Sequence, residues 1–198
     1  MGAKIVAIVG SYRKGGTVDA AVEAVLAGAR EHGAATHTIY LTEQHIEFCQ
    51  NCRTCTQTPG EARGTCPQHD DLAAILSEID AADGVVLGAP VNCFNVTAIF
   101  RRFLERLVGC CYWPWGQPMP RMREKVMWRK AVLVTSAAMP GPMIPLFTGA
   151  FKALRTAASM LQAQPVGKLC VGLAGGEPRE LKTSTLRRAR KLGERLAV

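Results

Sequence analysis

The chain has 198 residues, of which 48% are hydrophobic, and this length suits one compact α/β domain. Its formal net charge is +8, but the lysines and arginines are spread along the chain rather than packed into one arm, so we expect no nucleic-acid partner. No run of about 18 apolar residues occurs, and the apolar start KIVAIVG is too short for a signal peptide. We therefore expect a cytoplasmic protein with no membrane association.

The predicted elements alternate between strands and helices from the start of the chain. A β-branched run at 4–9 predicts a strand, and apolar residues at helical spacing from Val18 to Ala29 predict a helix. A second strand is expected at 36–41. After a long polar loop rich in cysteine, Asp70 is expected to cap the next helix.

The second half of the chain continues this alternation. A connection rich in proline and tryptophan follows the helix at 97–108, whose Arg106 is expected to face outward. Residues 141–147 are expected to form a loop. The remaining expected elements are strands at 84–90, 130–137 and 168–176 and helices at 148–161 and 186–196, the last with a solvent-exposed basic face.

Five strands alternating with five helices predict an α/β fold with a parallel sheet and helices on both faces, because parallel neighbours need crossover helices. We expect a single domain over 1–198 with a cysteine-rich loop insertion at about 45–69. Ligands of such sheets bind beyond the carboxyl ends of the strands.

The first turn, GSYRKGGTV at 10–18, is a candidate phosphate site, because a glycine-rich turn before a helix presents backbone N–H groups to an anion. It lacks the lysine of the triphosphate-binding loop, since Gly16 stands at that position, and Tyr12 replaces a glycine of the dinucleotide motif. The remaining hydroxyls and Arg13 suit a single terminal phosphate. The alternative is a tight turn whose glycines only permit positive φ.

This turn, the segment GAPVNCFNVTAIFRRFLERL at 88–107 and the segment VTSAAMPG at 134–141 resemble the NADPH-dependent FMN reductase family, and within it the iron-sulfur flavoprotein branch. The likeness extends over about residues 3–175. It implies a flavodoxin-like fold with a five-stranded parallel sheet and helices on both faces. It also implies FMN as cofactor and NAD(P)H as co-substrate.

The resemblance assigns cofactor binding to three loops but no dedicated catalytic side chain, because the flavin carries the chemistry. Thr17 and Val18 depart from the family's phosphate motif. Asn92 replaces an aromatic residue, so stacking beside the flavin is either lost or supplied by Phe94. The expected cofactor-binding residues are Ser11, Arg13, Gly15, Gly16, Thr17, Val18, Pro90, Val91, Asn92, Cys93, Phe94, Asn95, Thr135, Ser136 and Ala137.

Four cysteines form a candidate ligand set, since Cys49, Cys52 and Cys55 are each two residues apart and residues 56–65 separate Cys66 from them. This spacing suits a [4Fe-4S] cluster, and the resemblance supports that assignment. Free or reversibly oxidised thiols and a tetrahedral zinc site are the alternatives.

The expected activity is electron transfer from NAD(P)H, or from a reduced iron-sulfur partner, through FMN to a quinone, free flavin, metal ion or one-electron carrier. The alternative is a non-catalytic thiol-based redox or metal sensor that binds FMN. Expected partners are small redox substrates or an electron-carrier protein. The tryptophan-rich connection is either a lid, core filling or an oligomer contact, and the resemblance implies a homodimer or homotetramer.

Overall fold

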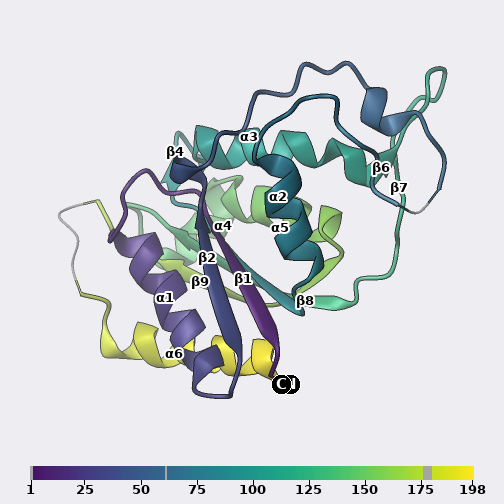
Figure 1. The fold of residues 1–198 in the computed structure, drawn as a ribbon. Helices are drawn as coiled ribbons and strands as arrows, with labels where there is room; N and C mark the ends of the chain where they lie inside the picture. The colour runs from purple at the N-terminus through teal and green to yellow at the C-terminus, as the bar shows by residue number, and fades with distance from the viewer. Residues whose placement is uncertain (1, 61, 176–179) are drawn as a thin grey trace.

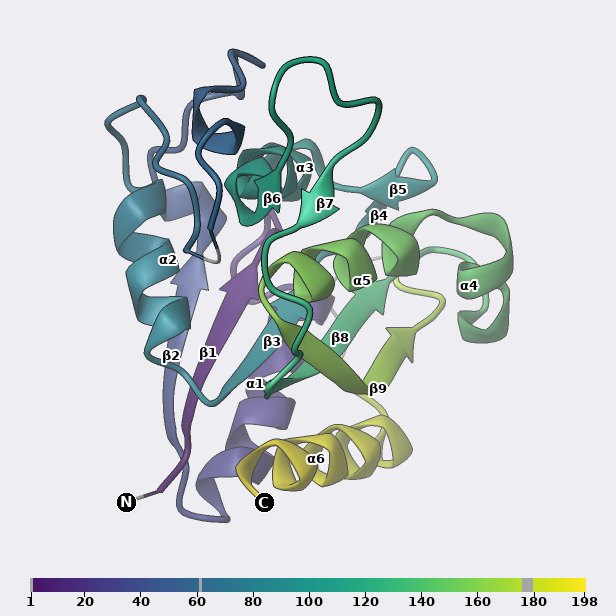
Figure 2. The same cartoon turned by 90° about the vertical axis from the view of Figure 1, so that its right-hand side faces the viewer.

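The computed structural model describes residues 2–60, 62–175 and 180–198. Its centre is a five-stranded parallel sheet in the order β2-β1-β3-β8-β9. The strands are β1 (Lys4–Val9), β2 (Ala35–Tyr40), β3 (Gly84–Gly88), β8 (Arg129–Ser136) and β9 (Ala163–Val171). All five point the same way in Figure 2, so their carboxyl ends share the upper edge and the chain termini lie below.

Helices cover both faces of the sheet (Figure 1). Each face of the sheet buries its own apolar cluster. One face packs against α1 and α6, and the other packs against α2, α3 and α5. The bounds of these helices are α1 (Thr17–Arg30), α2 (Leu72–Asp80), α3 (Ala98–Arg106), α5 (Ala150–Met160) and α6 (Thr183–Ala197). This strand order with two helical layers is the flavodoxin-like fold, as expected from the sequence.

The two helices of the first layer pack with their backbones in contact. A Cβ atom on Gly193 of α6 would lie 1.9 Å from the carbonyl oxygen of Val25, and one on Gly28 of α1 would lie 2.2 Å from that of Arg190. The basic residues of α6 are exposed while Ala189 and Leu192 are buried, which confirms the predicted solvated face.

Short elements lie outside the central sheet. A hairpin of β4 (Val91–Asn92) and β5 (Asn95–Val96) follows β3, and β6 (Cys111–Tyr112) pairs with β7 (Arg121–Met122) in the tryptophan-rich connection. The 3₁₀ segments are Leu41–Glu43, Thr54–Thr56, Leu107–Cys110 and Gly141–Met143. Among the described residues, no helix has the length and apolar composition needed to cross a bilayer.

The largest differences from the expected elements lie at residues 141–147 and in the last strand. Residues 141–147 are not a loop but a 3₁₀ turn followed by α4 (Ile144–Phe147). The last strand begins at Ala163, five residues earlier than expected, and ends at Val171; residue 176 lies outside the described residues. The early part of β9 escaped prediction because it contains Pro165, which an edge strand tolerates where the register shifts.

Candidate functional site

Three loops at the carboxyl edge of the sheet enclose one cavity of about 410 Å³. They follow β1, β3 and β8, and the segment after β9 closes a further side, so the cavity lies where the strand order reverses between β1 and β3. Its lining residues are Ser11, Tyr12, Arg13, Gly16, Thr17, Val18, Pro90, Val91, Asn92, Ser136, Ala137, Ala138, Ala174 and Gly175.

The first loop ends at Gly16, the N-cap of α1, which has no side-chain cap. The Ser11 hydroxyl accepts from the Arg13 backbone N–H at 3.2 Å and so shapes the turn. Gly15 has a φ of +75°, a conformation that glycine adopts without strain. The first-turn backbone N–H groups of α1 therefore face the loop without a capping side chain, which is the arrangement that binds a phosphate.

A buried carboxylate supports this loop from the side of β2. Asp19 accepts the Gly15 backbone N–H at 2.6 Å through one oxygen and the Tyr40 hydroxyl at 2.8 Å through the other. Burial, together with the hydrogen bond to Asp19, raises the pKa of Tyr40 to about 12. The tyrosine thus stays a neutral donor at physiological pH and holds Asp19 in position.

The second loop is tied directly to the first. Thr97, fully buried at the start of α3, donates its hydroxyl to the Gly10 carbonyl at 2.5 Å. The Tyr12 hydroxyl accepts the Ile99 backbone N–H at 3.2 Å. Gly10 itself packs on Phe100, where an added Cβ would lie 2.6 Å from the phenylalanine Cβ. These contacts fix the spacing between the phosphate loop and the loop after β3.

The hairpin after β3 turns through two residues with positive φ, Cys93 at 45° and Phe94 at 62°. Two such residues in sequence give a type I′ turn, whose twist matches that of the paired strands. The Phe94 side chain is 68% exposed at the tip, whereas Val91 and Asn92 line the cavity.

The third loop contributes Ser136, Ala137 and Ala138. Just before them, the Thr135 hydroxyl is fully buried and donates to the Ala89 carbonyl at 2.7 Å. The Ala174 backbone N–H donates to the Ala137 carbonyl at 2.9 Å. The end of the chain segment after β9 is thereby placed against the cavity.

The structure brings most of the predicted cofactor residues into this lining but not all of them. Whether they contact FMN stays a prediction. Tyr12, Ala138, Ala174 and Gly175 line the cavity and were not predicted. The sequence signal that could have found Ala174 and Gly175 is the Ala-Gly-Gly run after the final strand. The predicted residues outside the lining are Gly15, Cys93, Phe94, Asn95 and Thr135.

The four predicted cysteines all face a second, small cavity of about 20 Å³. Burial raises the pKa of the Cys55 thiol, and the nearby Cys66, Cys49 and Cys52 thiols raise it further. Hydrogen bonds from the Thr54 side chain and backbone lower the pKa of Cys52. Among the described residues, no three His, Cys, Asp or Glu side chains lie close enough together to hold a single metal ion.

Arg106 corrects a sequence-based expectation, because it faces inward. Its side chain and that of Asp70 are each only 1% exposed and form an ion pair at 2.5 Å. Arg106 also donates to the Glu47 carbonyl at 2.7 Å and approaches the Cys66 sulfur at 3.4 Å. These acceptors compensate the buried charge, which helical spacing alone could not reveal.

The electrostatics of this pair follow from its partners. Burial is the largest influence and acts to raise the pKa of Asp70, but the hydrogen bonds from Arg106 and from the backbone N–H groups of Glu47 and Leu72, together with the charge of Arg106, outweigh it and the pKa is lowered. The carboxylate also accepts the Leu72 backbone N–H at 3.1 Å, although the N-cap of α2 is Asp71 rather than the expected Asp70. Asp70 therefore joins the cysteine loop to both α2 and α3.

The tryptophan-rich connection packs against the cysteine loop. The Arg53 guanidinium lies 3.8 Å from the centre of the Trp113 ring and 4.2 Å from that of Trp115. Arg123 donates to the carbonyls of Thr58 and Cys55 at 2.7 and 3.1 Å. Two arginines thus bind the loop to a distant part of the chain.

The strand order and the loop-lined cavity at the β1/β3 switch point define a flavodoxin-like protein. The sequence profile of the NADPH-dependent FMN reductases matches residues 3–177, and the chain belongs to this family. It is accordingly classed as an NAD(P)H-dependent oxidoreductase that uses FMN.

Individual relatives carry the name iron-sulfur flavoprotein. One from Archaeoglobus fulgidus is 28% identical over 198 residues, covering 98% of this chain and 79% of the relative. One from Methanosarcina thermophila is 31% identical over 105 residues, covering 53% of this chain and about half, 52%, of the relative. Among solved structures, an NAD(P)H:quinone oxidoreductase from Methanothermobacter marburgensis superimposes with a TM-score of 0.72 at 17% identity, covering 99% and 98% of the two chains. That likeness shows the fold.

Proposed function

We propose that FMN binds in the 410 Å³ cavity, with its phosphate held by the loop at 10–18, and that the protein passes electrons from NAD(P)H through this flavin to an acceptor. The observation that carries the proposal is the convergence of three sequence-distant loops on one cavity at the switch point of the sheet. When bound, FMN would supply the hydride and electron chemistry.

The residues of the chain would position the bound FMN and stabilise its charges. The N-terminus of α1 offers backbone N–H groups and the positive end of the helix dipole to the phosphate, while Arg13 lines the same cavity. The loop from Ser136 to Ala138 presents small side chains, so its backbone can come close to a flat ring. The Thr97 and Thr135 hydrogen bonds keep these loops at fixed spacing without catalytic side chains.

We also propose a [4Fe-4S] cluster held by Cys49, Cys52, Cys55 and Cys66. The number and kind of donors support this proposal, because four thiols face one small cavity and each iron of a cubane takes one thiolate. The cavity of about 20 Å³ has room for about one water molecule, so the loop would have to open to admit a cluster. The buried Arg106 beside Cys66 would offset part of the negative charge of thiolate ligands. The names of the relatives agree with this assignment.

The remaining parts of the proposal concern acceptor and assembly. A cluster would allow single-electron delivery to a one-electron carrier, whereas quinones, free flavin or metal ions would suit a protein without it. We propose one domain over 1–198 with the insertion at 45–69, assembled as a homodimer or homotetramer. Exposed apolar side chains, among them Trp115 and Met119, support a contact surface in the tryptophan-rich connection.

Flavin binding is tested by titrating FMN into the purified protein and into two variants. Arg13→Ala removes a charge from the cavity and should weaken FMN binding about tenfold, as expected for one charge-assisted contact. Lys14→Ala removes the neighbouring charge, which instead pairs with Glu43 outside the cavity, and should change affinity by about twofold or less. Equal affinities for all three proteins, or no FMN uptake, would reject the assignment.

Cluster binding is tested on anaerobically purified protein by iron and sulfide content and by a visible absorption that dithionite bleaches. Cys52→Ser should lose iron and sulfide, and Cys170→Ser, which changes a cysteine of β9, should keep them. Rapid bleaching of the flavin bands by NADPH would separate an enzyme from a sensor without turnover. A wild-type protein that shows flavin bands but contains no iron would reject the cluster and leave the proposal of an FMN reductase standing.

A further inference from the structure

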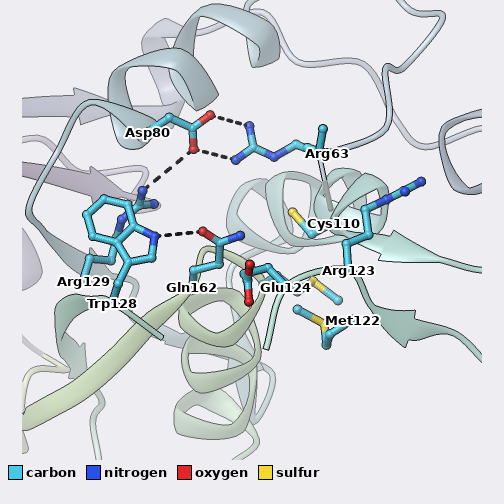
Figure 3. Close-up of a pocket in the computed structure, with 11 residues that line it drawn as sticks. Arg63, Asp80, Cys110, Met122, Arg123, Glu124, Trp128, Arg129 and Gln162 are labelled. Carbon is cyan, nitrogen blue, oxygen red and sulfur yellow. Dashed lines mark hydrogen bonds and ion pairs between the residues drawn. The ribbon is translucent and has the colours of Figure 1, made fainter. Parts of the chain in front are cut away.

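Another cavity, whose lining residues are drawn in Figure 3, lies at the amino end of β8, away from the proposed flavin site. It has a volume of about 280 Å³ and lies between the ends of α2 and α5, beside the first residue of β8. Because β8 runs from Arg129 to Ser136, about 23 Å of strand separates this cavity from the loop that lines the flavin site. It shares no lining residue with the proposed flavin site.

Arg129 is the central feature of this cavity. Its side chain is only 2% exposed, and the guanidinium donates to the Leu161 carbonyl at 2.9 Å. The Trp128 ring lies over it, 4.2 Å from centroid to guanidinium carbon. Within the described residues its Nε–H has no hydrogen-bond partner. A buried, incompletely partnered guanidinium is a costly arrangement that a bound anion or water would relieve.

The nearest carboxylate is already engaged elsewhere. Asp80 accepts two hydrogen bonds from Arg63, at 3.1 and 2.7 Å, and approaches Arg129 only at 3.9 Å. Glu124 uses one oxygen to accept the backbone N–H groups of Lys125 and Val126. Figure 3 shows Asp80 between the two arginines, with its short contacts on the Arg63 side. Asp80, at 3.9 Å, is thus the counter-charge of Arg129 among the described lining residues, but no carboxylate there is hydrogen-bonded to Arg129.

A neutral donor faces the same space. Gln162 holds a backbone φ of +56°, which a non-glycine residue rarely adopts, and its side-chain oxygen accepts the Trp128 indole N–H at 3.0 Å. Because the oxygen is engaged, the amide nitrogen is left as a donor toward the cavity, as Figure 3 shows. An arginine, an amide donor and an aromatic rim are groups that bind an oxyanion.

We propose that this cavity is a binding site for a small oxyanion of the phosphate or sulfate type, with Arg129 as its principal charge and Gln162 as a second donor. The volume leaves room for a small organic group attached to the anion. Two further lining residues are tied to the cysteine loop, because Arg63 belongs to it and Arg123 donates to its Cys55 carbonyl, so occupation would also brace that loop.

The test titrates inorganic phosphate into the full-length protein at constant ionic strength, with chloride as the matched salt. An excess of FMN occupies the flavin site, and the Arg13→Ala variant is run in parallel so that binding at the first loop is recognised. Calorimetry reports binding, and a rise in unfolding temperature confirms it. We expect saturable binding that neither FMN nor Arg13→Ala changes.

Two substitutions that should change phosphate affinity in opposite directions assign the site. Arg129→Met should weaken phosphate binding about tenfold or more, because it removes the charge-assisted donor. Glu124→Gln keeps the oxygen acceptor but removes a negative charge from the lining, so it should tighten binding by a few-fold. If Arg129→Met does not fold, Glu124→Gln still decides. The absence of saturable binding, or binding that Glu124→Gln leaves unchanged, would overturn the proposal.

Discussion

At the scale of single residues, the buried pair of Arg106 and Asp70 is the contact that holds the cysteine loop against α3. Arg106→Met should lower the free energy of unfolding by about 3–5 kcal/mol, because it leaves the Asp70 carboxylate buried without its partner. Chemical denaturation measures this loss. Limited proteolysis should also cut the loop at 45–69 faster in the variant, since the bond to the Glu47 carbonyl is lost.

The matched control for this prediction is the double variant Arg106→Met with Asp70→Asn, which removes both charges. It should recover much of the stability that Arg106→Met loses, since a neutral pair has no unpaired buried charge. A double variant as unstable as the single one would mean that the packing of Arg106, and not its charge, holds the loop.

Tyr40 gives a pH dependence whose sign follows from its shift. Burial and the bond to Asp19 raise the pKa of Tyr40 to about 12, above its ordinary value of about 10. The folded state therefore favours the neutral phenol. Its contribution to stability is fully present below about pH 10 and is lost as the pH rises through about 12.

The measurement is the unfolding free energy at several pH values for the wild type and for Tyr40→Phe. The variant should be less stable by about 1 kcal/mol near neutral pH, because the hydrogen bond to Asp19 is gone. The difference between the two proteins should shrink above about pH 10. A difference in stability that stays constant up to about pH 12 would show that folding does not raise the pKa of Tyr40.

At the scale of elements, the β4–β5 hairpin decides whether Phe94 adds a second aromatic ring to the cavity that Tyr12 already lines. Phe94→Gly should raise the free energy of unfolding by about 1 kcal/mol, because glycine adopts the φ of 62° without strain. Since Phe94 lies exposed at the tip and outside the lining, the substitution should leave FMN affinity unchanged. Thermal unfolding and FMN titration on the same sample check both effects.

An FMN affinity that falls about tenfold in Phe94→Gly would contradict this and support stacking of the phenyl ring on the flavin. Asn92→Ala serves as a comparison, because Asn92 does line the cavity and belongs to the same hairpin. Its substitution is expected to affect affinity more than that of Phe94.

How much of these elements could be predicted depends on the range of the interactions that form them. The strands, the main helices and the loop of Ser11 to Val18 follow from local periodicity and turn chemistry, so the sequence alone predicts them. The inward turn of Arg106 does not, because its partners lie about 36 and 59 residues away in the chain. The sequence likewise shows only that Tyr12 departs from a glycine motif. Its hydrogen bond to the start of α3 depends on a tertiary contact, which local sequence patterns do not reveal.

At the scale of the whole molecule, the parallel sheet separates two kinds of site. The proposed flavin cavity lies at the carboxyl edge, where helix N-termini and loop amides converge, and the arginine-lined cavity lies toward the amino ends of β8 and β9. The cysteine loop rises above α2 and α3 in Figure 2, next to the tryptophan-rich connection. An acceptor that approaches the cysteines would therefore meet a surface distinct from that of the flavin.

Because the protein has a net charge of +8, the salt dependence of the reaction rate should distinguish a charged acceptor from a neutral one. An acidic electron-carrier protein would be attracted over a distance that shrinks as salt is added, because the Debye length falls from about 30 Å at 0.01 M to about 10 Å at 0.1 M. The rate at which this carrier is reduced should therefore fall about tenfold or more between low and high ionic strength. A neutral quinone has no net charge to screen, and its rate should change by about twofold or less. Stopped-flow measurement of both reactions over one salt series gives the two slopes. Equal slopes would mean that the carrier's charge plays no part in its encounter with this protein, and the acceptor would then be sought among small molecules.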